Sequence, residues 1–284
     1  MQKIFNCKII EFLASDKIIL NGILLGSQKN TCILYIHGMN GNFYKNKIPF
    51  ELSNSKFFSV FSINTRGHDL LSTIKNNKNN ISYTAGTYAE NFDVSFNDIS
   101  GAVKLLKQLK FKKIILAGHS TGCQKILNYM ITQKNNDIFG LIFLAPADDY
   151  SIKKKELREE FQSFLKTASL LKNKKKGNIP SIKLGMFTPN RAISAYSLNK
   201  KEANLFYYDG NLKDFSKVKI PILVIFGSKE EYKDRNVKEY ISKLKLKTNS
   251  KFFKGIIIKN ARHSFYRYEK NIRLCIEEWY NEQR

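Results

Sequence analysis

The chain of 284 residues contains no long uninterrupted apolar run, and it has only five prolines and four cysteines. A membrane-spanning helix needs about 20 consecutive apolar residues, so none is expected. The cysteines form no CxxC pair, which excludes a disulfide framework and the usual zinc motifs. Met1–Leu13 has neither the apolar stretch nor the small-residue cleavage site of a secretory signal. We therefore expect a reduced, cytoplasmic compartment.

Acidic residues are also scarce: 24 Asp and Glu face 48 Lys and Arg, for a formal net charge of +24. Proteins that read nucleic acids concentrate their charge on one face and rely on Arg for bidentate contacts. Here only eight of the basic residues are Arg, and Lys is spread along the chain, including the asparagine-rich stretch 76–80. We interpret the excess charge as mostly solvated surface and expect no specific nucleic-acid partner.

Apolar residues make up 43% of the chain, enough for a sizeable core. Short apolar runs that end at turn residues alternate with segments of amphipathic helical spacing. The expected strands are 8–13, 18–25, 32–36, 57–63, 113–117, 139–144, 222–226 and 255–258, and the expected helices are 95–109, 123–133, 236–244 and 272–280. Such highly apolar strands suit a sheet that is covered on both faces. The pattern predicts an α/β fold with a mostly parallel sheet of about eight strands and helices on both faces.

One long stretch interrupts this alternation. Residues 150–219 contain a charged helix-like segment at 153–171, then a basic run at Lys172–Lys176. An insertion of this length between strands is more often a lid or binding element than a structureless loop. We therefore expect one structural domain, built from residues 1–149 and 220–284, with a lid at 150–219. Its apolar residues either face an acyl chain or pack the lid onto the domain: Leu157, Phe161, Phe164 and Leu165.

The motif that indicates chemistry is Gly118-His119-Ser120-Thr121-Gly122, a G-x-S-x-G pentapeptide. It lies between the expected strand 113–117 and the helical run from Cys123, which is the strand–turn–helix setting this motif requires. Such a turn lifts the serine hydroxyl above the ends of the strands. Ser120 is the predicted nucleophile.

A hydroxyl nucleophile needs a base, and His263 is the only histidine after Ser120. A serine–acid–histidine order along the chain is typical of this motif. The acid is less clearly defined. Glu230 stands three residues after Gly227, where the strand 222–226 ends, and is our first choice. The alternatives are Glu231, Asp234, Asp148 and Asp149.

A second early turn, His37-Gly38-Met39-Asn40-Gly41, ends the expected strand 32–36. A His-Gly turn in this position commonly presents a backbone amide to a developing oxyanion. We expect the amides of Met39 and Thr121 to form the oxyanion hole.

The chain resembles the α/β-hydrolase superfamily. The features that carry this resemblance are the His37-Gly38 turn, Arg66-Gly67-His68, the 118–122 motif, the Gly227 turn and His263. The longer stretches 118–124 and 144–149 are similar to a branch of uncharacterised hydrolases related to fungal siderophore esterases. The resemblance implies a serine hydrolase whose triad is Ser120, Glu230 and His263, although most of the superfamily has aspartate as the acid.

This resemblance implies cleavage of a carboxylic ester in a small-molecule substrate through an acyl-enzyme, with no metal or organic cofactor. The alternatives are an acyltransferase, amidase or thioesterase on the same scaffold, or a non-catalytic basic binding protein. The physiological substrate and the oligomeric state stay open, because fold does not determine function.

Overall fold

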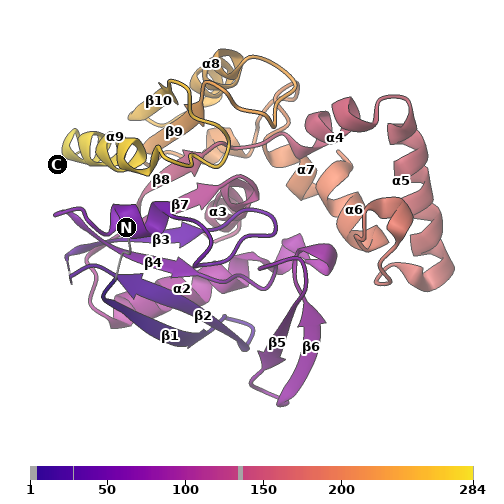
Figure 1. Ribbon diagram of the computed structural model, residues 1–284, viewed down its shortest axis with the longest axis horizontal. Coiled ribbons are helices and arrows are strands. Elements are labelled where there is room, and N and C mark those ends of the chain that lie inside the picture. The colour runs from indigo at the N-terminus through magenta and orange to yellow at the C-terminus, as the bar shows by residue number, and fades with distance from the viewer. Residues whose placement is uncertain (1–4, 28, 134–136, 284) are drawn as a thin grey trace.

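The computed structural model describes residues 5–27, 29–133 and 137–283. Its centre is a sheet of ten strands within these ranges, in the order β10-β9-β8-β7-β3-β4-β2-β5-β6, with β1 paired to β2 (Figure 1). The strands are β1 (Cys7–Leu13), β2 (Ile18–Leu25), β3 (Thr31–Ile36), β4 (Phe58–Ile63), β5 (Ser72–Asn76), β6 (Ile81–Ala85), β7 (Lys113–His119), β8 (Ile138–Leu144), β9 (Ile222–Gly227) and β10 (Phe253–Ile258).

The sheet is parallel from β10 through β4 and antiparallel at the other end, where β2 pairs with β1, β4 and β5. This confirms the predicted mostly parallel sheet and its opening hairpin. The predicted count of about eight strands was too low, because it missed β5 and β6. These two strands form an antiparallel hairpin whose tip is the asparagine-rich stretch 76–80. Most residues of β6 are exposed, so the hairpin lacks an apolar strand pattern.

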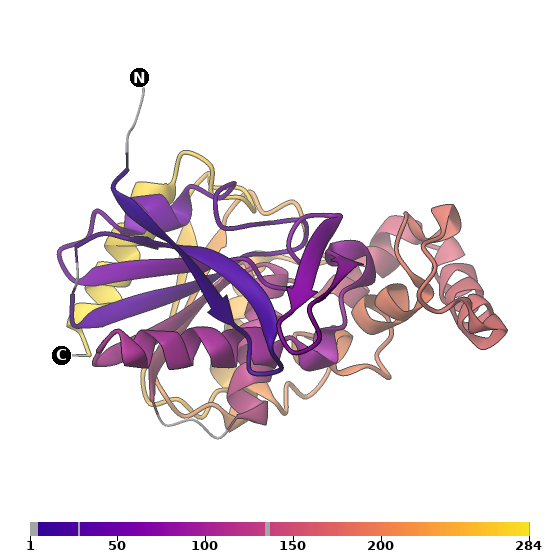
Figure 2. The ribbon, with the colours of Figure 1, turned by 90° about the horizontal axis from the view of Figure 1, so that it is seen from below.

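Helices cover both faces of the sheet. α1 packs against α9 on one face, and α2 packs against α3 on the other (Figure 2). This arrangement buries both sides of the central strands, which explains why every residue of β3, β4 and β9 is buried. The helices are α1 (Ile48–Leu52), α2 (Phe96–Gln108), α3 (Thr121–Thr132), α4 (Asp149–Leu157), α5 (Glu160–Leu171), α6 (Pro189–Tyr196), α7 (Lys201–Leu205), α8 (Val237–Lys247) and α9 (Glu269–Asn281).

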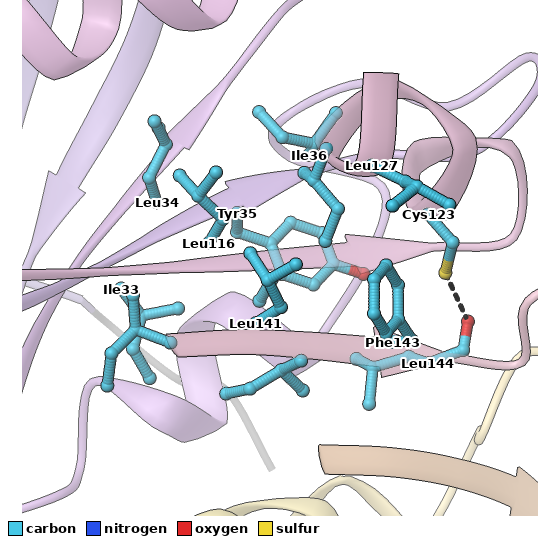
Figure 3. Packing of buried hydrophobic residues seen from close by; sticks show 14 of the residues in the cluster. Ile33, Leu34, Tyr35, Ile36, Leu116, Cys123, Leu127, Leu141, Phe143 and Leu144 are labelled. Atoms are coloured by element: carbon cyan, nitrogen blue, oxygen red, sulfur yellow. Dashed lines mark hydrogen bonds between the residues drawn. The ribbon is translucent and has the colours of Figure 1, made fainter. Parts of the chain in front are cut away.

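The core is densest where α3 lies on the central strands. Figure 3 shows side chains from β3, β7 and β8 packed together with Cys123 and Leu127 of α3. All of these side chains are fully buried. The start of α3, immediately after Ser120, is therefore held against the strand ends by the main hydrophobic core.

Between β8 and β9, helices α4 to α7 project beyond the sheet at one end of the molecule (Figure 1). The prediction of a single helix-like segment over 153–171 is wrong. Helix α4 ends at Leu157, and Arg158 adopts a positive φ of 49° before α5 begins. Phe161 is buried against Ala195 and Tyr196 of α6, and Leu157, Phe164 and Leu165 pack on this small cluster. These four apolar residues therefore pack helices of the insertion against one another.

Among the helices of the described ranges, none combines the length and the apolar character that a membrane span requires.

The packing of α2 on the opening hairpin leads to a prediction for Gly101. Alanine normally favours a helix over glycine by about 1 kcal/mol. At Gly101, however, a Cβ atom would lie 2.2 Å from the backbone oxygen of Leu13 and 2.7 Å from Cα of Ala14. Gly101→Ala should lower the free energy of unfolding by about 1–3 kcal/mol in denaturant titrations.

Lys104→Ala, at an exposed position on the same helix, is the matched control and should change stability by less than about 0.5 kcal/mol. A Gly101→Ala protein as stable as the wild type would show that α2 does not lie this close to the hairpin.

Candidate active site

Ser120 occupies a strained turn between β7 and α3. Its backbone has φ 53° and ψ −125°, a conformation that non-glycine residues rarely adopt. The two flanking glycines make the turn possible. A Cβ at Gly118 would lie 2.4 Å from the oxygen of Gly122, and a Cβ at Gly122 would lie 2.3 Å from the oxygen of Ile36. Such a turn persists only when its surroundings hold it in place.

The carbonyl of Leu144, at the end of β8, is one of the groups that hold it. It accepts a hydrogen bond from the Ser120 amide at 2.9 Å. It accepts another from the Cys123 thiol at 3.4 Å, which Figure 3 shows as a dashed line. Burial raises the pKa of Cys123 well above its ordinary value, so the thiol stays protonated and can donate. The Ser120 hydroxyl forms no hydrogen bond with any described residue and faces a cavity.

His263 and Glu230 form a close pair beside this turn. Nδ1 of His263 lies 2.8 Å from Oε1 of Glu230, and both side chains are nearly buried. The same carboxylate oxygen accepts a hydrogen bond from the amide of Tyr232 at 3.0 Å. With Nδ1 bound to the carboxylate, Nε2 is the ring nitrogen left for another partner.

The main chain of His263 is fixed from both sides. Its amide donates to Oε2 of Glu231 at 2.9 Å, and its carbonyl accepts from Nε2 of His119 at 2.9 Å. Burial, followed by the nearby His263, lowers the pKa of His119 to about 3, so His119 is a neutral donor. The residue that precedes Ser120 therefore bonds directly to His263.

The turn at 37–41 lies against the turn that carries Ser120. A Cβ at Gly38 would be 2.9 Å from Cβ of Ser120 and 3.0 Å from the oxygen of His119, so only glycine allows this approach. Within the described part of the chain, the amides of Met39 and Thr121 donate no hydrogen bond. Thr121 is also the first residue of α3, where the positive end of the helix dipole favours negative charge.

A buried hydrogen-bond chain that the sequence analysis missed supports the 37–41 turn. The Thr65 amide donates to Nε2 of His37 at 3.1 Å, so Nδ1 of His37 carries the proton and donates to the oxygen of Gly38. Behind them, Nζ of Lys125 donates to the Thr65 hydroxyl at 3.0 Å. Burial and the charge of Lys125 lower the pKa of His37 to about 3, which keeps its ring neutral.

Lys125 also joins a buried set of charges that links the insertion to the core. Its ammonium lies 2.6 Å from Glu90, whose carboxylate is 4.0 Å from Arg191 of α6. Arg191 in turn pairs with Glu202 at 2.5 Å. All four side chains are at most 2% exposed. Nothing in the sequence pattern marks these charges as buried, because lysine and glutamate on a helix or turn are normally solvated.

Ser120, Thr121, His263 and Met39 all line one cavity of about 700 Å³. The insertion contributes part of its wall, through α4 and α6: Ile152, Lys153, Glu156 and Tyr196. The wall also contains Tyr232 and Tyr266, which sequence reasoning did not identify. The cavity is therefore mixed in character, with aromatic surfaces and several amide and charged groups.

The remaining candidate acids have other hydrogen-bond partners than the imidazole of His263. Asp148 caps α4 by accepting from the Ser151 amide and also accepts from the Tyr208 amide. Asp149 lines the cavity and accepts from Nε2 of Gln124 at 2.8 Å. Asp234 is bound to Arg235 and to the Tyr240 hydroxyl. Of the five predicted carboxylates, Glu230 alone is hydrogen-bonded to the imidazole of His263.

The described residues contain no group of three or more His, Cys, Asp or Glu side chains placed to hold a metal ion.

The overall arrangement is shared with several solved structures. The siderophore hydrolase EstB from Aspergillus fumigatus matches with a TM-score of 0.69 at 15% identity, covering 98% of each chain. The Pyrococcus furiosus esterase Pf2001 matches with a TM-score of 0.62 at 16% identity, over 98% of this chain and 91% of the other. Est1E from Butyrivibrio proteoclasticus, solved with ferulic acid bound, matches with a TM-score of 0.62 at 16% identity, over 96% of this chain and 98% of the other. These similarities confirm the predicted α/β-hydrolase fold.

A search among curated proteins found no significant match. The family model described as "Protein of unknown function (DUF1749)" matches residues 76–278, which is more than half of the chain and includes Ser120, Glu230 and His263. The chain therefore belongs to the DUF1749 family.

Proposed function

We propose that this protein is a serine hydrolase that cleaves carboxylic esters. The observation that carries the proposal is the Glu230–His263 pair, 2.8 Å apart, beside a strained serine turn in the wall of one cavity. A serine, a histidine and a carboxylate in this relation activate a hydroxyl for attack on a carbonyl. The names of two of the similar structures, an esterase and a siderophore hydrolase, agree with this chemistry.

In this mechanism Nε2 of His263 removes the proton of Ser120 as the hydroxyl attacks the ester carbonyl. Glu230 holds the ring in the tautomer with hydrogen on Nδ1 and stabilises the imidazolium that forms. His263 then gives its proton to the leaving alcohol, and an acyl group stays on Ser120. Water, activated by the same histidine, releases the acid. Such contacts often tighten only when substrate binds, which accounts for a serine hydroxyl without a hydrogen bond beforehand.

The amides of Met39 and Thr121 would hold the oxyanion of the tetrahedral intermediate. Both are without an acceptor in the described ranges, and the glycine at 38 brings their two turns into contact. Preorganised amide donors of this kind stabilise the transition state because they need no reorientation when charge develops. The Lys125–Thr65–His37 chain would serve as support that keeps the first of these amides in position.

Glu230 suits the role of the acid better than the aspartates after β8. Burial raises the pKa of Asp148 to about 6. Burial, reinforced by Glu202, raises the pKa of Asp149 to about 8, so Asp149 is largely protonated at neutral pH. A residue that stabilises an imidazolium must itself be ionised, which disfavours Asp149 in that role.

We also propose that residues 150–219 act as a lid, because four residues of this stretch stand in the cavity wall next to the serine turn. The buried Arg191–Glu90 contact would hold the lid to the core.

Ser120→Ala should lower the turnover of short activated esters, such as p-nitrophenyl acetate, by at least about 1,000-fold, because the nucleophile is lost. The measurement is steady-state hydrolysis by purified protein. Ser264→Ala, which also changes a serine in the cavity wall, is the control and should retain most activity. Undiminished turnover in Ser120→Ala would exclude the mechanism.

Glu230→Gln should reduce turnover by roughly 100-fold or more, because an amide keeps the shape but favours the wrong imidazole tautomer. Asp234→Asn, Asp148→Asn and Glu231→Gln should each reduce it much less. Turnover numbers for the four variants, with folding checked by circular dichroism, decide the assignment. A larger loss in Glu231→Gln or Asp148→Asn would show that a different carboxylate is the acid.

Asp149→Asn should change how stability depends on pH. A folded-state pKa of about 8, above the ordinary value, means that the folded form binds more protons than the unfolded form between about pH 4 and 8. The contribution of Asp149 to the free energy of unfolding of the wild type therefore falls as pH rises through this window. The variant, which lacks this carboxyl group, should not show that fall. In denaturant titrations the variant should gain about 1–3 kcal/mol relative to the wild type between pH 5 and pH 8.

Asp209→Asn is the control for this experiment. Its exposed carboxylate bonds to Arg235 and Lys243, which hold its pKa below the ordinary value. The Asp209 carboxylate is therefore ionised and stabilising at both pH 5 and pH 8. Asp209→Asn should lower the free energy of unfolding by the same amount at the two pH values. If the difference in free energy of unfolding between Asp149→Asn and the wild type were also the same at pH 5 and pH 8, the pKa of Asp149 would not be raised.

A further inference from the structure

The excess positive charge of the chain is not evenly distributed. Between Phe161 and Lys201 there are nine of the 48 basic residues and none of the 24 acidic ones. Six of these lysines fall within residues 166–186, which we call the tip of the insertion. All six are exposed, and none forms a salt bridge with a described residue: Lys166, Lys172, Lys174, Lys175, Lys176 and Lys183.

The same tip exposes large apolar side chains. Ile182 is 87% exposed, Ile179 56%, Leu170 52% and Met186 50%. These four lie within 17 residues of one another along the chain, whereas scattered single apolar residues would need no explanation. Basic and apolar groups are thus presented by one short segment.

A tight turn explains why the apolar side chains point away from the protein. The Ser181 amide donates to the oxygen of Phe187 at 3.1 Å, which closes the turn 181–187. Within it Leu184 is buried against Ala168 of α5 and Ala192 of α6. Leu184 therefore anchors the turn to the helices, and the residues on either side of it, Ile182 and Met186, are left outside.

The tip also lies where another surface can reach it. In both views the part of the insertion formed by α5 and the turn after it is the part farthest from the central sheet (Figures 1 and 2). The strands and helices of the core therefore do not hinder contact between this end of the molecule and a flat surface.

We propose that the tip, residues 166–186, docks the protein on a lipid bilayer that contains anionic headgroups. The lysines complement the negative surface charge of such a bilayer, and the apolar side chains enter the boundary between headgroups and acyl chains. Each contribution alone is weak, so the contact is reversible. This proposal does not depend on the proposed hydrolase activity.

A bilayer fits the tip better than a nucleic acid does. The 166–186 segment has no arginine, which makes bidentate contacts with phosphates, and no aromatic residue, which stacks on bases. Exposed isoleucine, leucine and methionine have no partner on a phosphate backbone, but they have one in a bilayer interface.

The test is co-sedimentation of the full chain with vesicles of phosphatidylcholine, with or without phosphatidylglycerol. The wild type should bind the anionic vesicles at least about tenfold more tightly than the neutral ones, and high salt should release it, because salt screens the lysines. Equal binding to both vesicle types, or no binding to either, would overturn the proposal.

Two triple variants with the same change in charge and in apolar surface locate the contact. Lys174→Glu, Lys175→Glu and Ile182→Ser change the tip, whereas Lys245→Glu, Lys247→Glu and Leu246→Ser change exposed positions at the end of α8. The tip variant should lose at least about tenfold in affinity for anionic vesicles, and the α8 variant should bind like the wild type. Equal losses would mean that general charge, and not the tip, causes binding.

A third variant, Ile182→Ser with Met186→Ser, keeps every lysine. It should weaken vesicle binding and leave binding to a short DNA duplex unchanged, because only the bilayer offers an apolar partner. Vesicle binding equal to that of the wild type, or a DNA affinity that exceeds the affinity for anionic vesicles, would overturn the proposal in favour of a simple polyanion site. Circular dichroism and thermal unfolding of all variants confirm that these exposed changes leave the fold intact.

Discussion

The arrangement of the site depends on one close approach of backbones, where the beginning of α3 meets the end of β3. Gly122 lies so near the oxygen of Ile36 that a Cβ atom there would come within 2.3 Å of it. This contact places the Ser120 turn directly beside the turn at Gly38. A larger residue at 122 would push α3 away from β3 and would separate the serine from the Met39 amide. A single packing constraint thus positions Ser120 and the amides proposed as oxyanion donors, and the hydrophobic core around Cys123 and Leu127 maintains it.

Behind this contact lies an unusual concentration of buried charge. Lys125, Glu90, Arg191 and Glu202 are removed from water, and their desolvation is compensated only by their mutual attraction and hydrogen bonds. Such a cluster tolerates the loss of one member poorly, because an uncompensated buried charge would remain. Its geometry connects the 37–41 turn, through Thr65, with α6 and α7 of the insertion. The support of the site and the attachment of the insertion therefore share the same side chains.

The sequence predicted those features that local chemistry determines. The strand–turn–helix setting of Ser120 and the apolar strands are visible in short windows, because glycine spacing and burial on both sheet faces leave clear patterns. The β5–β6 hairpin was missed because its strands are largely exposed and polar. The break at Arg158 was missed because neither glycine nor proline marks it. Glu230 stayed one choice among five carboxylates, since the contact with His263 joins residues 33 positions apart.

Charge shows the same limit in a different way. A whole-chain total of +24 suggested solvated surface, and that interpretation fits lysines that are scattered among acidic residues. The sequence shows the basic run Lys172–Lys176, but only the structure shows that the segment 166–186 also exposes its isoleucines, Leu170 and Met186. A charge total for the whole chain averages over such local differences, whereas the exposure of each side chain in the structure reveals them. Conversely, the sequence could not show that Lys125 is buried, because the partners that neutralise it come from distant parts of the chain.

The central claim is that the fold activates Ser120 as a nucleophile, and covalent labelling tests it most directly. A fluorophosphonate reacts with an activated serine and is far less reactive toward an ordinary hydroxyl. Mass spectrometry of peptides from the labelled, folded protein should place one adduct on Ser120, and unfolding the protein before exposure should abolish it. A folded protein that stays unlabelled, or that carries the adduct on another serine, would contradict the account.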